Sequence, residues 1–153
     1  AMTAFFKDQL QVWFLENKQE ADRAAEQILI NKRARESAEK TKTNIKKMID
    51  GMYEIKPEVS VMIVSTMTPH SGSNWDFDAI KQQERQLESL AKQLRKDDKA
   101  VAVACVHSVS VSIQEHKTFN DYSGNNINHP NDWFCRVYAQ TILQTLIGYE
   151  NMK

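Results

Sequence analysis

The chain has 153 residues, of which 41% are hydrophobic and 26% are charged, so it is long enough for one domain with a buried core. Equal numbers of acidic and basic residues give a net charge of zero, which excludes a whole-chain field that would attract nucleic acid or an anionic membrane. No apolar run approaches the roughly 20 residues that a membrane span needs, and two cysteines are too few for a disulfide framework. We therefore expect a cytoplasmic protein with no membrane partner.

Residues 2–50 contain no Gly or Pro and are rich in strong helix formers. We predict a helical arm over 1–50, in which a first short helix ends near Asn17. A second helix is expected to follow, with apolar residues at helical spacing from Ala21 to Met52. Between residues 31 and 47 basic side chains outnumber acidic ones and make the arm locally cationic; they are Lys32, Arg33, Arg35, Lys40, Lys42, Lys46 and Lys47.

Residues 51–153 alternate between strand and helix patterns and form the second predicted domain. The β-branched apolar runs at 59–66 and 101–106 are typical of buried parallel strands. Between them, residues 77–98 place Leu and Ile on one face and charges on the other, which predicts an amphipathic helix. A strand, a helix and a strand at this spacing indicate a right-handed βαβ unit.

The end of the chain predicts a loop followed by a closing helix. An alternation of Ser and Val leads into a stretch rich in Gly, Asn and Pro, which indicates a loop. From Phe134 to Leu146 apolar residues then repeat at helical spacing, with Asn131 or Asp132 placed to cap the helix. The expected fold class is α/β: a partial three-layer, flavodoxin-like sheet with few parallel strands, preceded by a long helical arm.

The loop before the closing helix carries His129, in the run Asn128-His129-Pro130-Asn131-Asp132. In open α/β sheets, ligands and catalytic loops gather beyond the carboxyl ends of the strands. A histidine there can act as a general base, because the pKa of its imidazole lies near neutrality. The alternative is that His129 only fixes the turn by hydrogen bonding.

Residues 42–150 resemble the C-terminal half of an SGNH (GDSL-type) hydrolase. The likeness rests on IKPEVSVMIVSTMTP, on VAVACVHS and above all on GNNINHPNDWFCRVYAQTILQTL. The resemblance implies that His129 is the catalytic base of a serine ester hydrolase acting on acyl or carbohydrate esters. Asn126 stands where the family pattern has the Asp that orients the imidazole, and Asp121 or Asp132 are the alternatives for that role.

The chain departs from this family at the nucleophile. The sequence has no Gly-Asp-Ser block and no Gly-x-Asn-Asp block, so it lacks both the nucleophile and the oxyanion-hole Asn that the family uses. Ser65, Ser71 and Ser73 are the hydroxyls expected at the same end of the sheet, and Cys135 falls inside the closing helix, where a thiol is ordinarily buried and structural. The other histidines show no paired ligand spacing, so we expect no metal site and no cofactor.

The helical arm resembles a different family. The segment from about residue 5 to 47, with its Ala-Arg-rich stretch at 32–40, is similar to the helical end of the ATPase region of a bacterial type II topoisomerase B subunit. The resemblance implies a coupling or dimerising helix whose basic face makes weak contacts with nucleic acid backbones. Two unrelated likenesses that meet near residue 45 leave open a fused, fragmentary or designed sequence.

A two-stranded sheet is marginal alone, which predicts that this chain self-associates as a homo-oligomer. Three functions remain as alternatives at this stage. The first is an SGNH-like fold that assembles without catalysis, the second is an ester hydrolase based on His129, and the third is a basic arm that contacts nucleic acid.

Overall fold

The computed structural model describes residues 2–70 and 77–150, with side chains from 18 to 70 and from 77 to 148. The chain forms two compact units, residues 1–33 and 34–153. One helix, α1 (Met2–Ile55), contributes to both units. Within the first unit, every side chain from 18 to 33 is exposed.

The helix α1 is continuous, so the predicted break near Asn17 is wrong. Residues 2–50 contain no Gly or Pro, and a single Asn costs too little helix propensity to end a helix without one of them. The helix also continues through Gly51 and ends at Ile55, just before Pro57. The missing amide hydrogen and ring of a proline disfavour helix at and before its position.

The second unit has the βαβ order that the sequence predicts. Strand β1 (Ser60–Val64) is followed by α2 (Phe77–Lys96) and by β2 (Ala100–Ala104). The two strands pair in parallel, with Ser60 opposite Ala100 and Val64 opposite Ala104. Strands, parallel pairing and amphipathic helix are thus confirmed, with ends that differ by one or two residues from those expected.

Three further elements complete the chain. The helix α3 (Val106–Gln114) starts two residues after β2, a short 3₁₀ turn η1 covers Phe119–Asp121, and α4 (Asp132–Glu150) closes the chain. The sequence did not predict α3, and Val106 begins this helix instead of ending a strand. As expected, Asn131 caps α4, because its Oδ1 accepts the backbone N–H of Phe134 at 3.0 Å.

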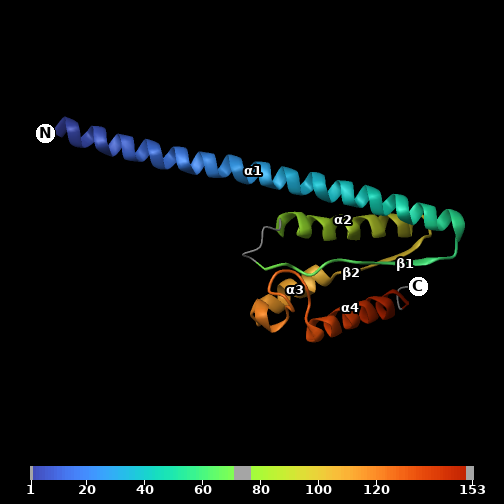
Figure 1. Ribbon diagram of the computed structural model, residues 1–153. Helices are drawn as coiled ribbons and strands as arrows, with labels where there is room; N and C mark the ends of the chain where they lie inside the picture. The colour runs from blue at the N-terminus through green and yellow to red at the C-terminus, as the bar shows by residue number, and fades with distance from the viewer. Residues whose placement is uncertain (1, 71–76, 151–153) are drawn as a thin grey trace. The chain divides into compact units, whose positions relative to one another are not determined.

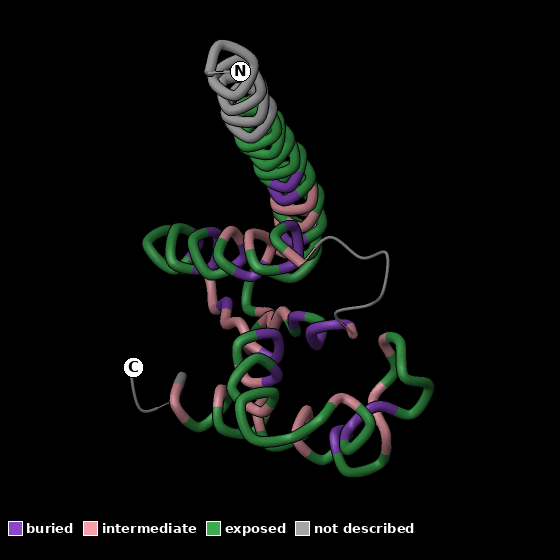
Figure 2. Tube along the Cα trace, turned by 90° about the vertical axis from the view of Figure 1, so that its left-hand side faces the viewer, coloured by how far each residue is buried: buried purple, intermediate pink, exposed green. Residues whose placement is uncertain are grey.

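Helices cover both faces of the two-stranded sheet. The views in Figures 1 and 2 place α2 and the end of α1 on one side of the sheet and α3 and α4 on the other. Above the sheet, Ile49 of α1, Leu90 and Leu94 of α2 and Val101 of β2 form one buried cluster. Below it, Met67, Val106, Tyr122 and Phe134 form a second. The mixed α/β class is therefore observed.

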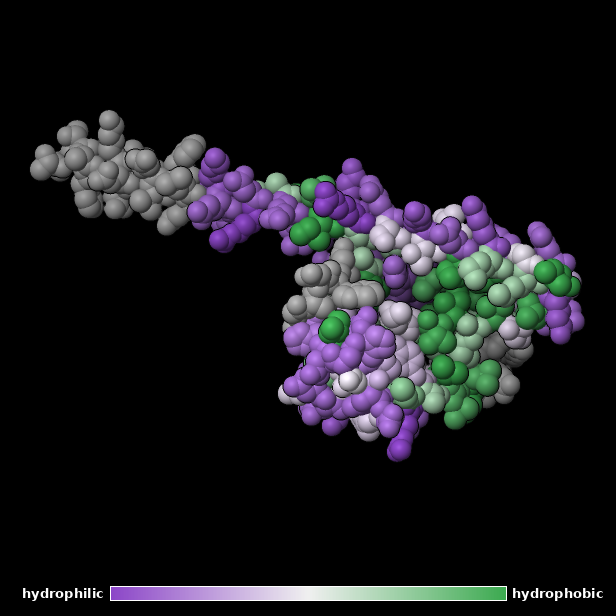
Figure 3. Space-filling model, in the orientation of Figure 1, coloured by the Kyte–Doolittle hydropathy of each residue, from purple (hydrophilic) through white to green (hydrophobic). Residues whose placement is uncertain are grey.

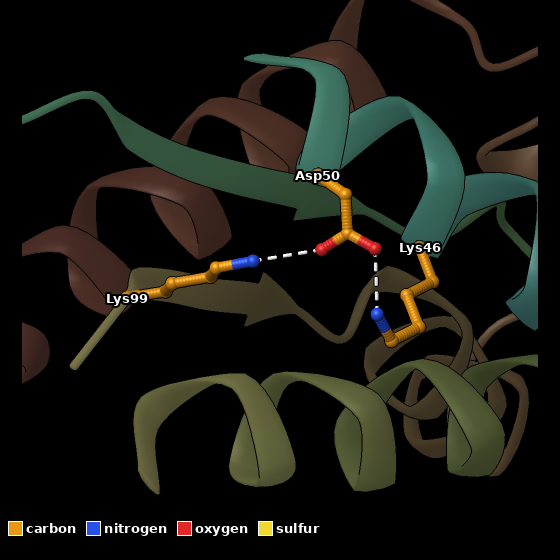
Figure 4. A network of polar contacts seen from close by, with 3 residues as sticks. All are labelled: Lys46, Asp50 and Lys99. Carbon is orange, nitrogen blue, oxygen red and sulfur yellow. Dashed lines mark hydrogen bonds and ion pairs between the residues drawn. The ribbon is translucent and has the colours of Figure 1, made fainter. Parts of the chain in front are cut away.

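A charged network fastens the end of α1 to the start of β2 (Figure 4). The carboxylate of Asp50 accepts hydrogen bonds from Lys46 at 2.6 Å and from Lys99 at 2.7 Å. Lys46 lies one turn earlier in α1, whereas Lys99 directly precedes β2. The hydrogen bonds from Lys46 and then Lys99 lower the pKa of Asp50. Lys46 is one of the basic residues between 31 and 47, and its ammonium is thus bound within the fold. Lys42, from the same stretch, donates to the side chain of Gln86 at 3.1 Å.

Candidate functional site

The loop that carries His129 is organised by the side chain of Asn125. Its Oδ1 accepts the backbone N–H groups of Ile127, Asn128 and His129 at 2.9 to 3.0 Å. The backbone N–H of Gly124 donates to the carbonyl of His129 at 2.8 Å, which closes the loop. The turn is therefore held mainly by local hydrogen bonds, and the N–H of His70, in the segment after β1, donates to the carbonyl of Ile127 at 2.9 Å.

The same asparagine decides which nitrogen of His129 carries the proton. Three backbone N–H groups fix Asn125 Oδ1, so the amide nitrogen Nδ2 must face the imidazole, where it lies 2.6 Å from Nδ1. An amide nitrogen only donates, so Nδ1 accepts and the neutral ring carries its hydrogen on Nε2. In a serine hydrolase the arrangement is reversed, since Nδ1–H is oriented by a carboxylate and Nε2 accepts the proton.

The other two predicted site residues lie apart from His129 in the hydrogen-bond network. Asn126 is exposed and has a positive φ of 55°, a left-handed conformation that Asn tolerates in tight loops. Asp132 is exposed in the first turn of α4, where a carboxylate favours the helix dipole. Within the part of the chain that the structure describes, neither side chain has a hydrogen bond to His129.

Of the candidate nucleophiles, Ser65 lies buried at the end of β1 and donates to the carboxylate of Glu84. Ser71 and Ser73 lie outside the described residues. Cys135 is exposed on α4, so the expectation of a buried thiol is wrong. The hydroxyl of Ser65 thus has a carboxylate partner and no imidazole partner among the described residues.

Glu84 is the centre of a buried polar cluster that the sequence did not predict. It projects from α2, is 3% exposed, and accepts from four groups. Two are the backbone N–H groups of His107 and Ser108, at 3.0 and 3.1 Å, and two are the hydroxyls of Ser65 and Ser108. The carboxylate thereby caps the N-terminus of α3, where unpaired N–H groups and the helix dipole favour a negative charge.

A weak signal for this cluster exists in the sequence. Ile80, Glu84, Leu87 and Ala91 recur at spacings of four, three and four, so an acidic residue interrupts the apolar stripe of an amphipathic helix. A buried carboxylate needs hydrogen-bond donors, which marks Glu84 as a residue with a distant partner. The partner of Glu84 cannot be identified from the sequence, because the N-terminus of α3 comes after β2 and is distant from Glu84 along the chain.

A second set of buried polar groups surrounds His107. Its Nδ1 lies 2.8 Å from the hydroxyl of Thr68, and the hydroxyl of Ser110 lies 2.9 Å from that of Thr68. The backbone N–H of Thr68 donates to Ser110 Oγ at 2.8 Å, which ties the segment after β1 to α3. Burial lowers the pKa of His107 from its ordinary value of 6.5, although the charge of Glu84 opposes the shift.

The shifted pKa of His107 predicts a pH dependence of stability. Because the folded protein binds this proton more weakly than the unfolded chain does, the contribution is complete above pH 6.5 and is lost as the pH falls toward the folded pKa. The free energy of unfolding, from urea denaturation at pH values between about 7.5 and 5.5 around the ordinary pKa, should decrease on the acid side. The decrease should be smaller in His107→Asn, and an unchanged slope in that variant would contradict the assignment.

The carboxylate of Glu84 also affects the pKa of the other cysteine, Cys105. Burial, followed by the charges of Glu84 and Glu88, raises the pKa of the Cys105 thiol to about 12. A thiol with so high a pKa is protonated at neutral pH and is a poor nucleophile.

Comparison with known proteins found no matching family, no similar curated protein and no similar solved structure. Over the described residues, no group of three or more His, Cys, Asp or Glu side chains is arranged to hold a metal ion. The helices described in the same residues include none long and apolar enough to cross a membrane.

Proposed function

We propose that this chain is a non-catalytic assembly module, which associates with a second copy of itself through the open edge of β1. The observation that carries the proposal is that this edge of the sheet has backbone groups with no hydrogen-bond partner among the described residues, and apolar side chains on both sides. An SGNH-like, partial flavodoxin-like sheet is part of the same proposal, since such a sheet ordinarily continues beyond two strands.

The hydrogen bonds identify which residues of β1 face outward. The backbone N–H of Ser65 donates to the carbonyl of Ala104 at 3.1 Å, so Ser65 points toward β2. Alternate residues of a strand point their N–H and C=O groups to opposite edges. Met62 and Val64 therefore direct theirs away from β2, and no described residue forms a hydrogen bond with them there.

The opposite edge of the sheet is different. By the same alternation, the backbone N–H and C=O groups of Val101 and Val103 point to the outer edge of β2, away from β1. The guanidinium of Arg95 donates to the carbonyl of Val101 at 2.8 Å, and the N–H of Val101 donates to the carbonyl of Lys99 at 3.0 Å. Side-chain and local bonds thus occupy both backbone groups of Val101 on this edge, and they discourage a further strand there.

Apolar side chains flank the open edge. Figure 3 shows hydrophobic surface gathered beside β1, between the end of α1 and α4. From residue 34 of α1 onward, in β1 and beyond the first turn of α4, the large exposed hydrophobic side chains are Met48, Met52 and Ile55 on α1, Val64 on β1, and Leu143, Leu146 and Ile147 on α4. We call this set the edge face. On α1 these residues are four and three apart, and on α4 Leu143 lies three residues before Leu146 and four before Ile147. Each helix therefore presents one apolar stripe.

A second copy suits the edge face because the face is self-complementary. An antiparallel pairing of β1 with β1 of a second copy, about a two-fold axis normal to the sheet, brings α1 to α1 and α4 to α4. Apolar stripes match themselves, whereas a patch of one charge would repel its copy. The net charge of zero adds no long-range repulsion between copies.

The ester hydrolase is the less favoured function. A base in the tautomer held by Asn125 has its proton on the nitrogen that would have to accept one. The hydroxyl of Ser65 is directed to Glu84, and the Cys105 thiol has a pKa of about 12. The hydrogen bond between Asn125 and His129 supports the alternative in which His129 helps to fix the turn.

The test is the oligomeric state of the full chain, measured by sedimentation velocity over a range of concentrations. We expect a reversible dimer, and we expect Val64→Lys to weaken it by about tenfold or more, because a charged residue on an edge strand opposes pairing. Val111→Lys is the matched control, since it makes the same exchange at equal exposure, 40% against 41%, on α3 outside the edge face.

Two results would overturn the proposal. One is a wild-type chain that stays monomeric at the highest concentration tested. The other is a dimer that Val64→Lys and Val111→Lys weaken equally. Circular dichroism of both variants separates a loss of pairing from a loss of folding.

A further inference from the structure

An open surface cavity of about 520 Å³ lies between α3 and the first turn of α4. Its apolar walls are formed by Val109 and Ile113 of α3 and by the ring of Trp133 of α4. Its polar groups are the hydroxyls of Ser108 and Ser112, the imidazole of His116 and the ammonium of Lys117, of which the Ser108 hydroxyl already donates to Glu84. The cavity shares no residue with the edge face or with the loop around His129.

The cavity has the composition of a small-molecule site. Such sites typically have volumes of about 300 to 1,000 Å³ and are apolar, with a few polar groups that orient the ligand. An aromatic ring and two branched aliphatic side chains supply the apolar walls. The imidazole and the ammonium lie together just beyond the C-terminal end of α3, because His116 and Lys117 directly follow its C-cap residue, Glu115.

The charge of the cavity is positive at Lys117. Its Nζ lies 5.2 Å from the centre of the Trp133 ring, a cation–π contact that holds the ammonium at the cavity wall. The neighbouring carboxylate of Asp121 instead accepts the N–H and hydroxyl of Thr118 at 2.8 and 2.9 Å. Lys117 forms no salt bridge with any residue that the structure describes. The charge of Lys117 does act on the nearby carboxylate of Asp121, whose pKa is lowered mainly by its hydrogen bonds with Thr118 and in part by Lys117.

Two further acidic residues are close in sequence but do not line the cavity. Glu115 precedes His116, and Asp132 precedes Trp133, and both are exposed. The wall is thus a hydrophobic surface with hydroxyl groups, the imidazole of His116 and one cation, Lys117, which has no salt bridge among the described residues. That combination is complementary to a ligand with an apolar ring and a single negative charge.

We propose that this cavity binds a small aromatic carboxylate. The ring lies between Val109, Ile113 and Trp133, and the carboxylate pairs with Lys117. The hydroxyl of Ser112 provides a neutral donor for the carboxylate. The inference is independent of the proposed self-association, because it uses none of the residues of the edge face.

The experiment uses 2-naphthoate as the probe and 2-naphthalenemethanol as its uncharged counterpart, with the full chain. Binding is measured by isothermal titration calorimetry and by amide chemical shifts. We expect saturable binding of 2-naphthoate, with shifts that concentrate on α3 and the start of α4. Lys117→Met should weaken the binding of 2-naphthoate by about tenfold, the loss expected for a charge-assisted contact. It should leave the affinity for the alcohol unchanged.

The control variant is Lys96→Met, which removes an exposed lysine at the end of α2 and should leave both affinities unchanged. Ile113→Trp should fill the cavity and abolish binding of both probes. The inference is overturned if 2-naphthoate does not saturate, if Lys117→Met binds it as well as the wild type does, or if Lys96→Met weakens it as much. It is also overturned if Val64→Lys abolishes binding, because the probe would then occupy the edge face.

Discussion

Glu84→Ala is expected to lower the free energy of unfolding by about 3 kcal/mol, since removal of a buried acceptor takes a hydrogen bond from each of four donors and leaves some of them unsatisfied. The carboxylate of Glu84 accepts hydrogen bonds from four groups, and two of them are N–H groups in the first turn of α3. Alanine leaves the N–H and the hydroxyl of Ser108 without this acceptor, whereas the N–H of His107 keeps Ser65 Oγ at 3.1 Å and the hydroxyl of Ser65 keeps the carbonyl of Ala104 at 3.3 Å. The loss should appear in urea denaturation followed by circular dichroism.

Glu84→Gln separates the charge from the shape of this side chain. Glutamine has one acceptor oxygen, and its amide nitrogen would face a donor, so we expect a loss of about 2 kcal/mol in place of a rescue. The control is Glu88→Gln, which makes the same exchange one turn later on α2 at an exposed position. If Glu84→Gln proved as stable as the wild type, the carboxylate would not be needed to cap α3.

Phe134→Ala is the second large effect, with an expected loss of about 3 to 5 kcal/mol for a fully buried aromatic side chain. Phe134 is 0% exposed, and its ring centre lies 5.2 Å from that of Tyr122 and 5.5 Å from that of Tyr138. Alanine would leave a cavity between η1 and α4 that rigid neighbours cannot fill. The free energy of unfolding in urea at neutral pH measures the effect.

The neighbouring Trp133 provides the control for this variant. Its side chain is 41% exposed, so Trp133→Ala should cost only about 1 kcal/mol or less. Phe134→Ala should also loosen the loop around His129, because Asn131 bonds to the N–H of Phe134 and its Nδ2 donates to the carbonyl of Asp121. Equal losses in the two variants would argue against a core below the sheet that centres on Phe134.

Much of the α/β unit follows from local sequence patterns. The β-branched runs, the amphipathic helix between them and the cap at Asn131 are all signals that act within a few residues, and the structure has each of them. The buried positions follow the sides of the helices that face the sheet (Figure 2). Patterns of this kind are reliable because burial of one face selects them directly.

The features that the sequence did not predict depend on contacts between distant residues. The alternation of Ser and Val hides α3, whose helical spacing is carried only by Val106, Val109 and Ile113, and a carboxylate from α2 caps its N-terminus. The role of Asn125 was missed for a different reason. Its side chain binds three backbone groups and His129 at once, an arrangement that follows from the loop conformation.

The exposed stripe of α1 shows the limit of periodicity in another way. Apolar residues recur at helical spacing along this helix, yet Ala34, Ala38 and Ile49 are buried while Ile28 and Met48 are exposed. A helical repeat identifies a face, but the partner that covers it decides which part of the face is buried. The stripe at the end of α1 remains available for a partner.

The unequal edges of the sheet determine how far an assembly could grow. Arg95 occupies the carbonyl of Val101, so in the proposed assembly we expect strands to be added at the edge of β1 and not at the edge of β2. Pairing through β1 then uses up the single receptive edge of each copy, so growth stops at two chains and a filament cannot propagate. If the proposed dimer forms, Arg95→Ala would free the carbonyl of Val101 at the second edge, and closed pairs could then add further copies to form open-ended polymers.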